Sequence, residues 1–205
     1  MGNYLGVKMD AIERLIGGFR QGDLYAIATR PGCGKTHFCI SIACHFAKLS
    51  KNVLYISDTL NREIFEARMD IISPTRSGKV VFKECYKLTI DRLSEWLKNE
   101  SFDLLVIDPF NAYCFDVDIG ELKELAQEIG IPVLLSKIIS AESSNDNEPL
   151  ALSHIRFPSE SILDKFIAYT SVILFGFQTA ENDTITLKVA KNIYGSIGQA
   201  IQFKK

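Results

Sequence analysis

Residues 22–36 read Gly-Asp-Leu-Tyr-Ala-Ile-Ala-Thr-Arg-Pro-Gly-Cys-Gly-Lys-Thr, and this stretch decides the fold. The apolar run Leu24–Ala28 predicts a strand, and the apolar-rich run His37–Lys48 predicts a helix. Between them lies a glycine-containing turn that closes on Gly34-Lys35-Thr36. A strand, such a turn and a helix in this order are typical of a phosphate-binding loop.

The residue types of this turn suit a nucleoside triphosphate. Glycine lets backbone N–H groups turn toward phosphate oxygens, and a helix that begins near Lys35 adds the positive end of its dipole. We expect Lys35 to contact the β- and γ-phosphates of ATP and the Thr36 hydroxyl to bind Mg²⁺. The Walker A pattern has glycine at its first position, where this chain has Thr29. The predicted ATP-binding residues are Thr29, Arg30, Pro31, Gly32, Cys33, Gly34, Lys35, Thr36 and His37.

An acidic residue to hold the magnesium through water is expected on a neighbouring strand. Residues 103–108 read Asp-Leu-Leu-Val-Ile-Asp, and their four apolar residues predict a buried parallel strand. Asp108 follows that strand at the edge where α/β sheets bind ligands. We interpret Asp108 as the Walker B carboxylate; the alternative is an aspartate that caps the turn before Pro109.

Length and charge limit the other possibilities. The chain has 205 residues, 47% of them hydrophobic, which fits one globular domain. Its formal net charge of −2 gives no general attraction for nucleic acid, so such binding would need a local patch or an assembly. An apolar run of about 18 residues and a signal-peptide pattern are both absent from the sequence, and we expect a cytoplasmic protein.

The five cysteines show no Cys-x-x-Cys spacing, so a zinc site or a disulfide framework is not expected. We expect four of them to be buried or partly buried thiols. Cys33 lies inside the phosphate-binding turn, where it is either a small filler or a thiol whose alkylation would block the nucleotide.

Strand and helix patterns alternate along the rest of the chain. We expect strands at 53–57, 80–82, 132–136, 171–177, 184–191 and 199–203, and helices at 61–72, at 89–99 capped by Thr89, and after Asp118 up to Gly130. Residues 139–149 are polar and predict a loop. The alternation predicts an α/β fold with a mostly parallel sheet covered by helices on both faces, closed by antiparallel C-terminal strands.

Several of these segments resemble the ATPase domain of DnaB-type replicative helicases, within the RecA-like P-loop group. The strongest are Ile16-Gly17-Gly18-Phe19, Gly22-Asp23-Leu24 and the run 28–36, and weaker ones follow in the family's order at 57–68, 104–109, 122–126, 131–133, 152–156 and 191–198. The resemblance implies a RecA-like core that binds ATP between subunits, usually in a hexameric ring around single-stranded DNA. It implies for residues 1–205 a single RecA-like ATP-binding domain without the family's N-terminal domain and linker.

The chain departs from the family at the groups that support hydrolysis. The family's Ser-Leu-Glu-Met-like tetrad, whose glutamate polarises water, is Ser57-Asp58-Thr59-Leu60 here. A threonine hydroxyl does not accept a proton near neutral pH, so either Asp58 acts as the base or hydrolysis is slow. The family's Lys-x-Arg finger, which reaches the neighbouring subunit's ATP, corresponds to Lys191 and Ile193, and the arginine is therefore missing.

A third departure is Lys137, which stands where the family has a glutamine that senses the γ-phosphate. It either contacts phosphate as a point charge or is a solvated lysine at a strand end. We thus predict Lys137 and Lys191 as further ATP-binding residues, Thr36 and Asp108 as metal ligands, and Lys35, Asp58 and Asp108 as catalytic residues.

Two segments are candidates for single-stranded DNA. Residues 110–117 offer Phe110, Tyr113 and Phe115 for base stacking, although these rings can equally pack against the sheet. Residues 137–161 carry no excess of positive charge.

Three functions remain open at this point. The first is a slow ATPase derived from a helicase core, acting as a homo-oligomer or with a larger replication protein in DNA replication or recombination. The second is a nucleotide-binding regulatory or scaffold module that has lost turnover. The third is a small RecA-like recombinase.

Overall fold

The computed structural model describes residues 9–75, 77–110, 115–139, 151–179 and 184–204. Its helices are α1 (Met9–Ile16), α2 (Lys35–Lys48), α3 (Arg62–Ile72), α4 (Ile90–Asn99), α5 (Ile119–Ile129) and α6 (Glu160–Tyr169), with a 3₁₀ turn at Leu152–His154. Its strands are β1 (Leu24–Thr29), β2 (Val53–Ser57), β3 (Val80–Glu84), β4 (Leu88–Thr89), β5 (Leu104–Ile107), β6 (Phe115–Asp116), β7 (Val133–Ile138), β8 (Thr170–Thr179), β9 (Thr184–Asn192) and β10 (Ala200–Lys204).

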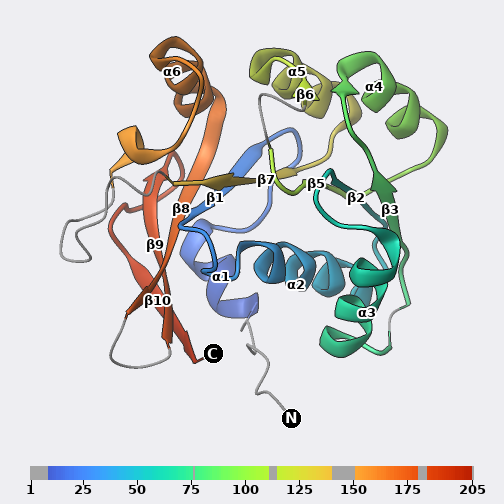
Figure 1. Ribbon diagram of the computed structural model, residues 1–205, viewed down its shortest axis with the longest axis horizontal. Coiled ribbons are helices and arrows are strands. Elements are labelled where there is room, and N and C mark those ends of the chain that lie inside the picture. The colour runs from blue at the N-terminus through green and yellow to red at the C-terminus, as the bar shows by residue number, and fades with distance from the viewer. Residues whose placement is uncertain (1–8, 76, 111–114, 140–150, 180–183, 205) are drawn as a thin grey trace.

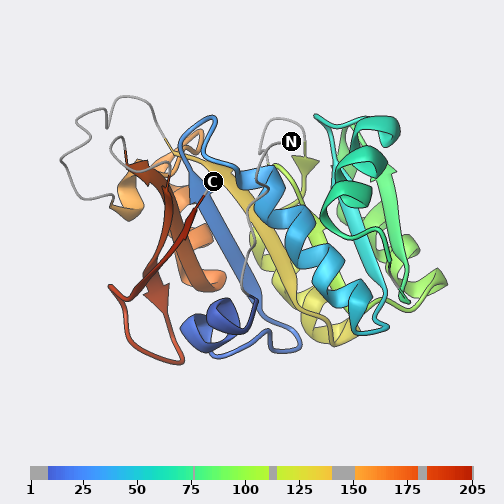
Figure 2. The same ribbon diagram turned by 90° about the horizontal axis from the view of Figure 1, so that it is seen from below.

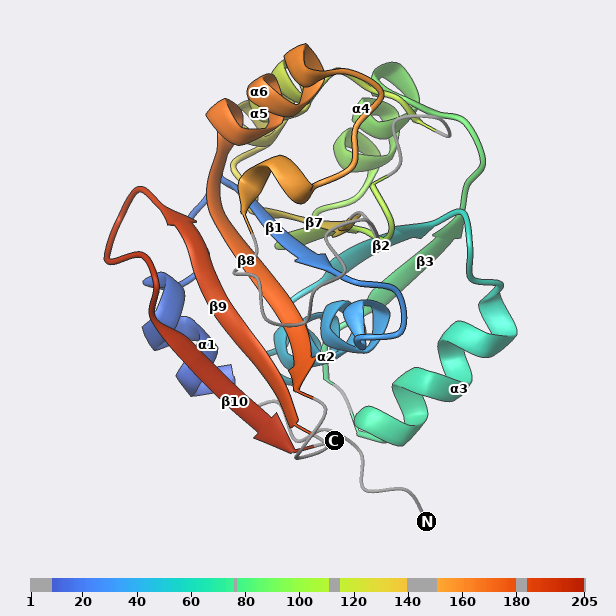
Figure 3. The same ribbon diagram turned by 60° about the vertical axis from the view of Figure 1, so that its left-hand side comes forward.

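Eight of the strands form one sheet in the order β10-β9-β8-β1-β7-β5-β2-β3 (Figure 1). The six strands from β8 to β3 are parallel to one another, whereas β9 pairs antiparallel with β8 and with β10. Figure 3 shows β8, β9 and β10 side by side, with α1 next to the last two. The predicted α/β fold, mostly parallel with antiparallel C-terminal strands, is confirmed.

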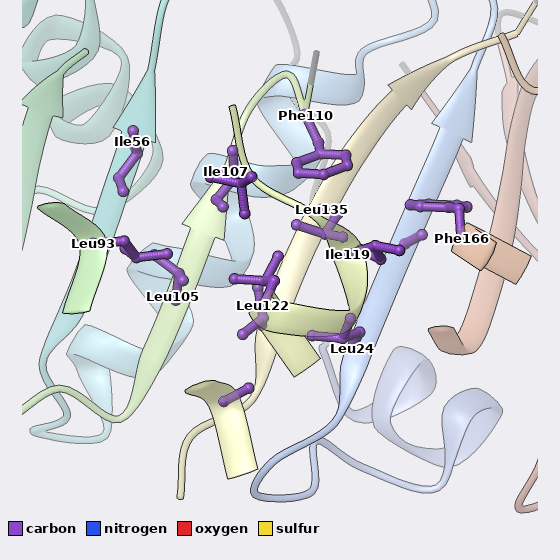
Figure 4. Close-up of a cluster of buried hydrophobic side chains, with 14 of the residues drawn as sticks. Leu24, Ile56, Leu93, Leu105, Ile107, Phe110, Ile119, Leu122, Leu135 and Phe166 are labelled. Atoms are coloured by element: carbon purple, nitrogen blue, oxygen red, sulfur yellow. The ribbon is translucent and has the colours of Figure 1, made fainter. Parts of the chain in front are cut away.

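Helices cover the two faces of the sheet in two groups (Figure 1). The first group is α1, α2 and α3, and Figure 2 shows α2 running along the middle of that face. The second group is α4, α5 and α6. Figure 4 shows how Leu24, Leu105 and Leu135 from the sheet meet Ile119, Leu122 and Phe166 from α5 and α6. Because both faces are covered, β1 and β5 are buried along their whole length and consist mainly of apolar residues.

Local capping signals set the helix boundaries. The side chains of Asn61, Thr89 and Asp118 accept hydrogen bonds from the first-turn amides of Ile64, Arg92 and Gly120. Gly130 closes α5 in the left-handed conformation, at φ 77°. The predictions of helices that begin at Thr89 and Asp118, and of a stop at Gly130, are therefore confirmed.

Two features differ from the sequence-based expectation. Helices α1 and α6 had no predicted counterpart, yet α6 is capped by Ser159 and places Phe166 fully inside the core. Asp108 was expected on a strand next to β1, and this placement is wrong: β7 lies between β1 and β5. The order of parallel strands depends on packing between distant segments, which the local pattern does not encode.

A close approach between β1 and β8 explains how Thr29 fits where the Walker A pattern has glycine. Thr29 is paired with Gly176, and a Cβ at Gly176 would lie 2.8 Å from the Thr29 Cγ2 atom and 3.2 Å from the Leu187 Cδ2 atom. The missing side chain of Gly176 thus leaves room for the threonine at the start of the phosphate-binding turn.

This fit predicts that Gly176→Ala lowers the free energy of unfolding by about 1–3 kcal/mol through overpacking. Thr29→Ala removes the Cγ2 atom, so the double variant should recover most of that loss, and urea unfolding of the wild type, both single variants and the double variant measures it. Strictly additive losses would contradict the proposed steric pairing.

Candidate functional site

The turn between β1 and α2 has the geometry of an anion cradle. Gly32 and Gly34 adopt φ values of 80° and 76°, in the left-handed region that side chains disfavour. Gly34 is the N-cap of α2 and offers no side chain to the first helical amides. These amides and the positive end of α2 are thus presented to whatever occupies the turn, which suits a phosphate group.

Asp108, which follows β5, contacts Lys35 at the start of α2, although β7 lies between β5 and β1 in the sheet. The Lys35 Nζ atom lies 3.1 Å from Asp108 Oδ1, and the aspartate is fully buried while the lysine side chain is 15% exposed. Two hydroxyl groups complete the contacts of the carboxylate: Tyr55 donates to Oδ2 over 2.7 Å, and Ser136 donates to Oδ1. The predicted Walker A lysine and Walker B aspartate are therefore brought together in the fold.

The tetrad after β2 is fixed to the same point. Ser57 donates from its hydroxyl to the main-chain carbonyl of Asp108, and the amide of Asp108 donates to the carbonyl of Ile56. The Ser57 oxygen in turn accepts from the amides of Thr59 and Leu60, at 3.3 and 3.2 Å. The tetrad Ser57-Asp58-Thr59-Leu60 is thus held beside Asp108.

Within this tetrad, Asp58 is partly buried and Thr59 is exposed. The Oδ1 atom of Asp58 is buried and has no hydrogen-bond partner in the described part of the chain. An acceptor atom in this condition costs free energy unless it meets water or a ligand group. Asp58 also lies close enough to Cys85 for its charge to contribute to raising the pKa of that thiol, after the effect of burial.

Lys137 is buried rather than solvated. It exposes 6% of its surface, donates to the Phe110 carbonyl over 2.9 Å, and lies 3.9 Å above the centroid of the Phe157 ring. Burial lowers the pKa of Lys137 to about 8, and the nearby charge of Lys35 contributes in the same direction. The ammonium group of Lys137 is therefore bonded inside the protein, near enough to Lys35 for the two charges to interact.

Lys191 donates to the carbonyls of Ile167 and Ala168 in the last turn of α6. The C-terminal end of a helix is the negative end of its dipole, so a cation is stabilised there. Burial lowers the pKa of Lys191. Ile193, at the position of the finger arginine, is 58% exposed. The role of Lys191 toward the ATP of a neighbouring subunit stays a prediction.

The predicted DNA-binding segments are described in part. Phe110 is buried and stacks on Phe166 with a centroid separation of 6.3 Å, so for this ring the packing alternative is confirmed. Tyr113 lies outside the described residues, as do 140–150 of the second segment, and Phe115 is placed only as part of β6. Arg156 is exposed and Ile155 is buried.

The thiols that the structure describes follow the expectation. Cys39, Cys44 and Cys85 are buried and Cys33 is partly exposed, while Cys114 lies outside the described residues. Burial raises the pKa of the Cys39 thiol, and the negative charge of Asp108 adds to this effect.

Among the described residues, no helix is long and apolar enough to cross a membrane. No group of three or more His, Cys, Asp or Glu side chains among them is arranged to hold a metal ion by itself.

The arrangement fits a magnesium-bound nucleoside triphosphate. The left-handed glycines and the uncapped start of α2 offer amide donors, and Lys35 offers a charge. The Thr36 hydroxyl, at the second position of α2, and the Asp108 carboxylate supply the oxygen atoms that Mg²⁺ prefers. Sequence reasoning missed Tyr55 and Ser136, which contact the carboxylate; the only signal was a pair of hydroxyl groups in otherwise apolar strands.

Residues 5–108 match the family described as the DnaB-like helicase C terminal domain. Over 92 residues the chain is 28% identical to the DNA repair protein RadA of Campylobacter jejuni subsp. jejuni, which amounts to 45% of this chain and 20% of RadA. The chain thus spans about a fifth of the length of that curated relative.

Two solved structures share the fold at low identity. A DnaB-like replicative helicase, from a structure that also concerns its interactions with primase, is 14% identical with a TM-score of 0.70, over 94% of this chain and 59% of that one. The flagellar accessory protein FlaH from Methanocaldococcus jannaschii is 16% identical with a TM-score of 0.69, over 99% and 95%. At these identities the likeness shows the RecA-like ATPase fold.

The buried ammonium of Lys137 predicts a pH dependence of stability. Its pKa is about 8 in the folded protein and 10.5 in the unfolded chain, so between these values the unfolded chain binds more protons. The free energy of unfolding contributed by Lys137 therefore rises with pH across this window. Urea unfolding from pH 8 to pH 10 should show the wild type gaining stability relative to Lys137→Met.

The matched control is Lys188→Met, because Lys188 is an exposed lysine on β9. Its stability difference from the wild type should stay constant over the same range. A constant difference for Lys137→Met as well would show that the Lys137 ammonium is solvated.

Proposed function

The chain belongs to the DnaB-like helicase C-terminal domain family, and on that premise we propose that it is a Mg-ATP-binding P-loop ATPase with slow hydrolysis. It acts in DNA replication or recombination, as a homo-oligomer or as a partner of a larger replication protein. The observation that carries the proposal is the contact of Lys35 with Asp108 beside the left-handed glycines of the β1–α2 turn.

ATP binding depends on groups that are all present. The amides of the turn and the Lys35 ammonium bind the phosphates, while Thr36 and Asp108 hold the magnesium, Asp108 through water. Magnesium held by these residues would neutralise the negative charge that develops on phosphate oxygens during phosphoryl transfer. The Lys35 ammonium donates to Asp108 Oδ1, so the groups proposed to bind phosphate and magnesium lie in direct contact.

Slow hydrolysis follows from the groups that differ. Thr59 does not replace a glutamate base, and Ile193 does not replace an arginine finger. Trans-acting arginines contribute roughly 10³–10⁵ to the rate in NTPases where they have been measured. Asp58, whose buried Oδ1 atom lacks a partner in the described chain, is the group placed to accept a proton from water.

The second candidate is a regulatory or scaffold module that binds ATP without turnover. The exposed Thr59 and Ile193 favour it, since neither side chain supports hydrolysis. A similar fold occurs in a protein named as a flagellar accessory protein, over nearly the whole of both chains. ATP-dependent assembly without phosphate release would support this module, and release stimulated by single-stranded DNA would support the ATPase.

The first prediction from the ATPase proposal is that Lys35→Ala abolishes ATP binding. It removes the only side-chain charge of the turn that is paired with Asp108. Equilibrium binding of ATP, with Lys48→Ala as the control, measures the effect, because Lys48 is an exposed lysine at the other end of α2. Binding of ATP by Lys35→Ala with the wild-type affinity would show that the site is assigned wrongly.

The next prediction concerns the base. If phosphate is released above the Lys35→Ala background, Asp58→Asn should lower that release at least about tenfold, because general-base catalysis contributes roughly 10²–10⁴. Steady-state phosphate release with and without single-stranded DNA is the measurement, and ATP affinity should stay unchanged. Unaltered release would refute the role of Asp58, whereas ATP binding with no release in the wild type would favour the module.

A further inference from the structure

We propose that Tyr55 is a positioning residue for the magnesium site: its phenol holds one oxygen of Asp108 so that the other stays directed at Lys35 and the phosphate-binding turn. The inference rests on the proposed binding of Mg-ATP and adds to it a residue that neither the sequence motifs nor the family match points out.

The contacts of Asp108 divide between its two oxygens. The Oδ2 atom accepts from the Tyr55 hydroxyl over 2.7 Å. The Oδ1 atom accepts from the Lys35 ammonium over 3.1 Å and from the Ser136 hydroxyl. One cation and two neutral donors thus surround a carboxylate that is fully buried.

Only the cation can leave this arrangement when ATP binds. Lys35 lies on α2 next to the turn and is partly exposed, so its ammonium is free to turn to phosphate. Without other donors, the buried carboxylate would then lose hydrogen bonds at a large cost in free energy. Tyr55 and Ser136 keep both oxygens bonded, and the place on Oδ1 that Lys35 leaves becomes open to a magnesium-bound water.

The ring of Tyr55 is fixed by its neighbours. It is fully buried, and its centroid lies 4.7 Å from the Phe65 ring on α3 and 6.2 Å from the Phe82 ring on β3. Residue 55 also pairs with Val106, two residues before Asp108, in the register of β2 and β5. The phenol is therefore held in place by packing, as a group that orients another residue must be.

The protonation state agrees with this role. Burial and the negative charge of Asp108 raise the pKa of the Tyr55 hydroxyl well above its usual value. The neutral phenol is the form that donates to Asp108 Oδ2, as the hydrogen bond shows. Phenylalanine would fill the same space between Phe65 and Phe82, so the packing does not require the hydroxyl group of Tyr55, whereas the contact with Asp108 does.

The test measures how much Mg²⁺ strengthens ATP binding. The ratio of ATP affinity with Mg²⁺ to that with EDTA is determined by equilibrium titration for the wild type and Tyr55→Phe. We expect the ratio to fall about tenfold in Tyr55→Phe, the size of a lost hydrogen bond to a charged group, with the affinity in EDTA within about twofold of the wild type.

The matched control is Tyr25→Phe. Tyr25 is also a buried tyrosine in the sheet, but its hydroxyl bonds the main chain at Gly18 and Arg20. Tyr25→Phe should keep the wild-type ratio. Ser136→Ala, which removes the donor on Oδ1, should lower the ratio like Tyr55→Phe and serves as the second variant if Tyr55→Phe does not fold.

The double variant Tyr55→Phe/Asp108→Asn separates a positioning role from a general structural one. Because Tyr55 acts through Asp108, the double variant should have the same ratio as Asp108→Asn alone. An unchanged ratio in Tyr55→Phe, or an equal further drop on the Asp108→Asn background, would overturn the inference while leaving Mg-ATP binding intact. A wild-type protein without any gain from Mg²⁺ would overturn the magnesium site and this inference together.

Discussion

The ion pair between Lys35 and Asp108 is the contact on which the rest of the site depends. It joins residues 73 positions apart in the sequence across an intervening strand, so it exists only when β1, β7 and β5 are adjacent in this order. A fully buried carboxylate is costly unless charge and hydrogen bonds satisfy it. Asp108 is contacted by Lys35 at the start of α2 and by the hydroxyl groups of Tyr55 on β2 and Ser136 on β7. The same contacts therefore stabilise the fold and shape the candidate nucleotide site.

The machinery for binding and the machinery for turnover are separable in this chain. The groups proposed to bind phosphate and metal are tied to the core by the pair Lys35–Asp108. The groups that differ from the family, Thr59 and Ile193, are exposed at its surface. Substitutions at exposed positions usually change the free energy of unfolding little, whereas substitutions in the buried network lower it. The proposed loss of hydrolysis therefore costs little stability, and a loss of the binding residues would cost more. Even Thr29 fits the turn only because Gly176 gives it room.

The sequence predicted what is encoded locally. The glycine-containing turn before α2, the caps at Thr89 and Asp118 and the stop at Gly130 each follow from neighbouring residues, and the structure confirms them. The position of β7 between β1 and β5, the helix α6 and the burial of Lys137 depend on distant segments. For Tyr55, a strand pattern shows that the residue is buried, but not that its hydroxyl faces a carboxylate on the next strand. The contact between Tyr55 and Asp108 therefore became visible only in the tertiary structure.

Lys137 connects the nucleotide site with the two segments expected to meet DNA. Its ammonium bonds the carbonyl of Phe110, where the first segment begins, and lies over Phe157 in the second. Burial lowers the pKa of Lys137, and the positive charge of Lys35 adds to this effect. A triphosphate bound beside Lys35, as proposed, would bring negative charge near Lys137 and favour its charged form. In this form the ammonium donates to the Phe110 carbonyl and is attracted to the Phe157 ring, so the proposed nucleotide site and both segments depend on this one charge.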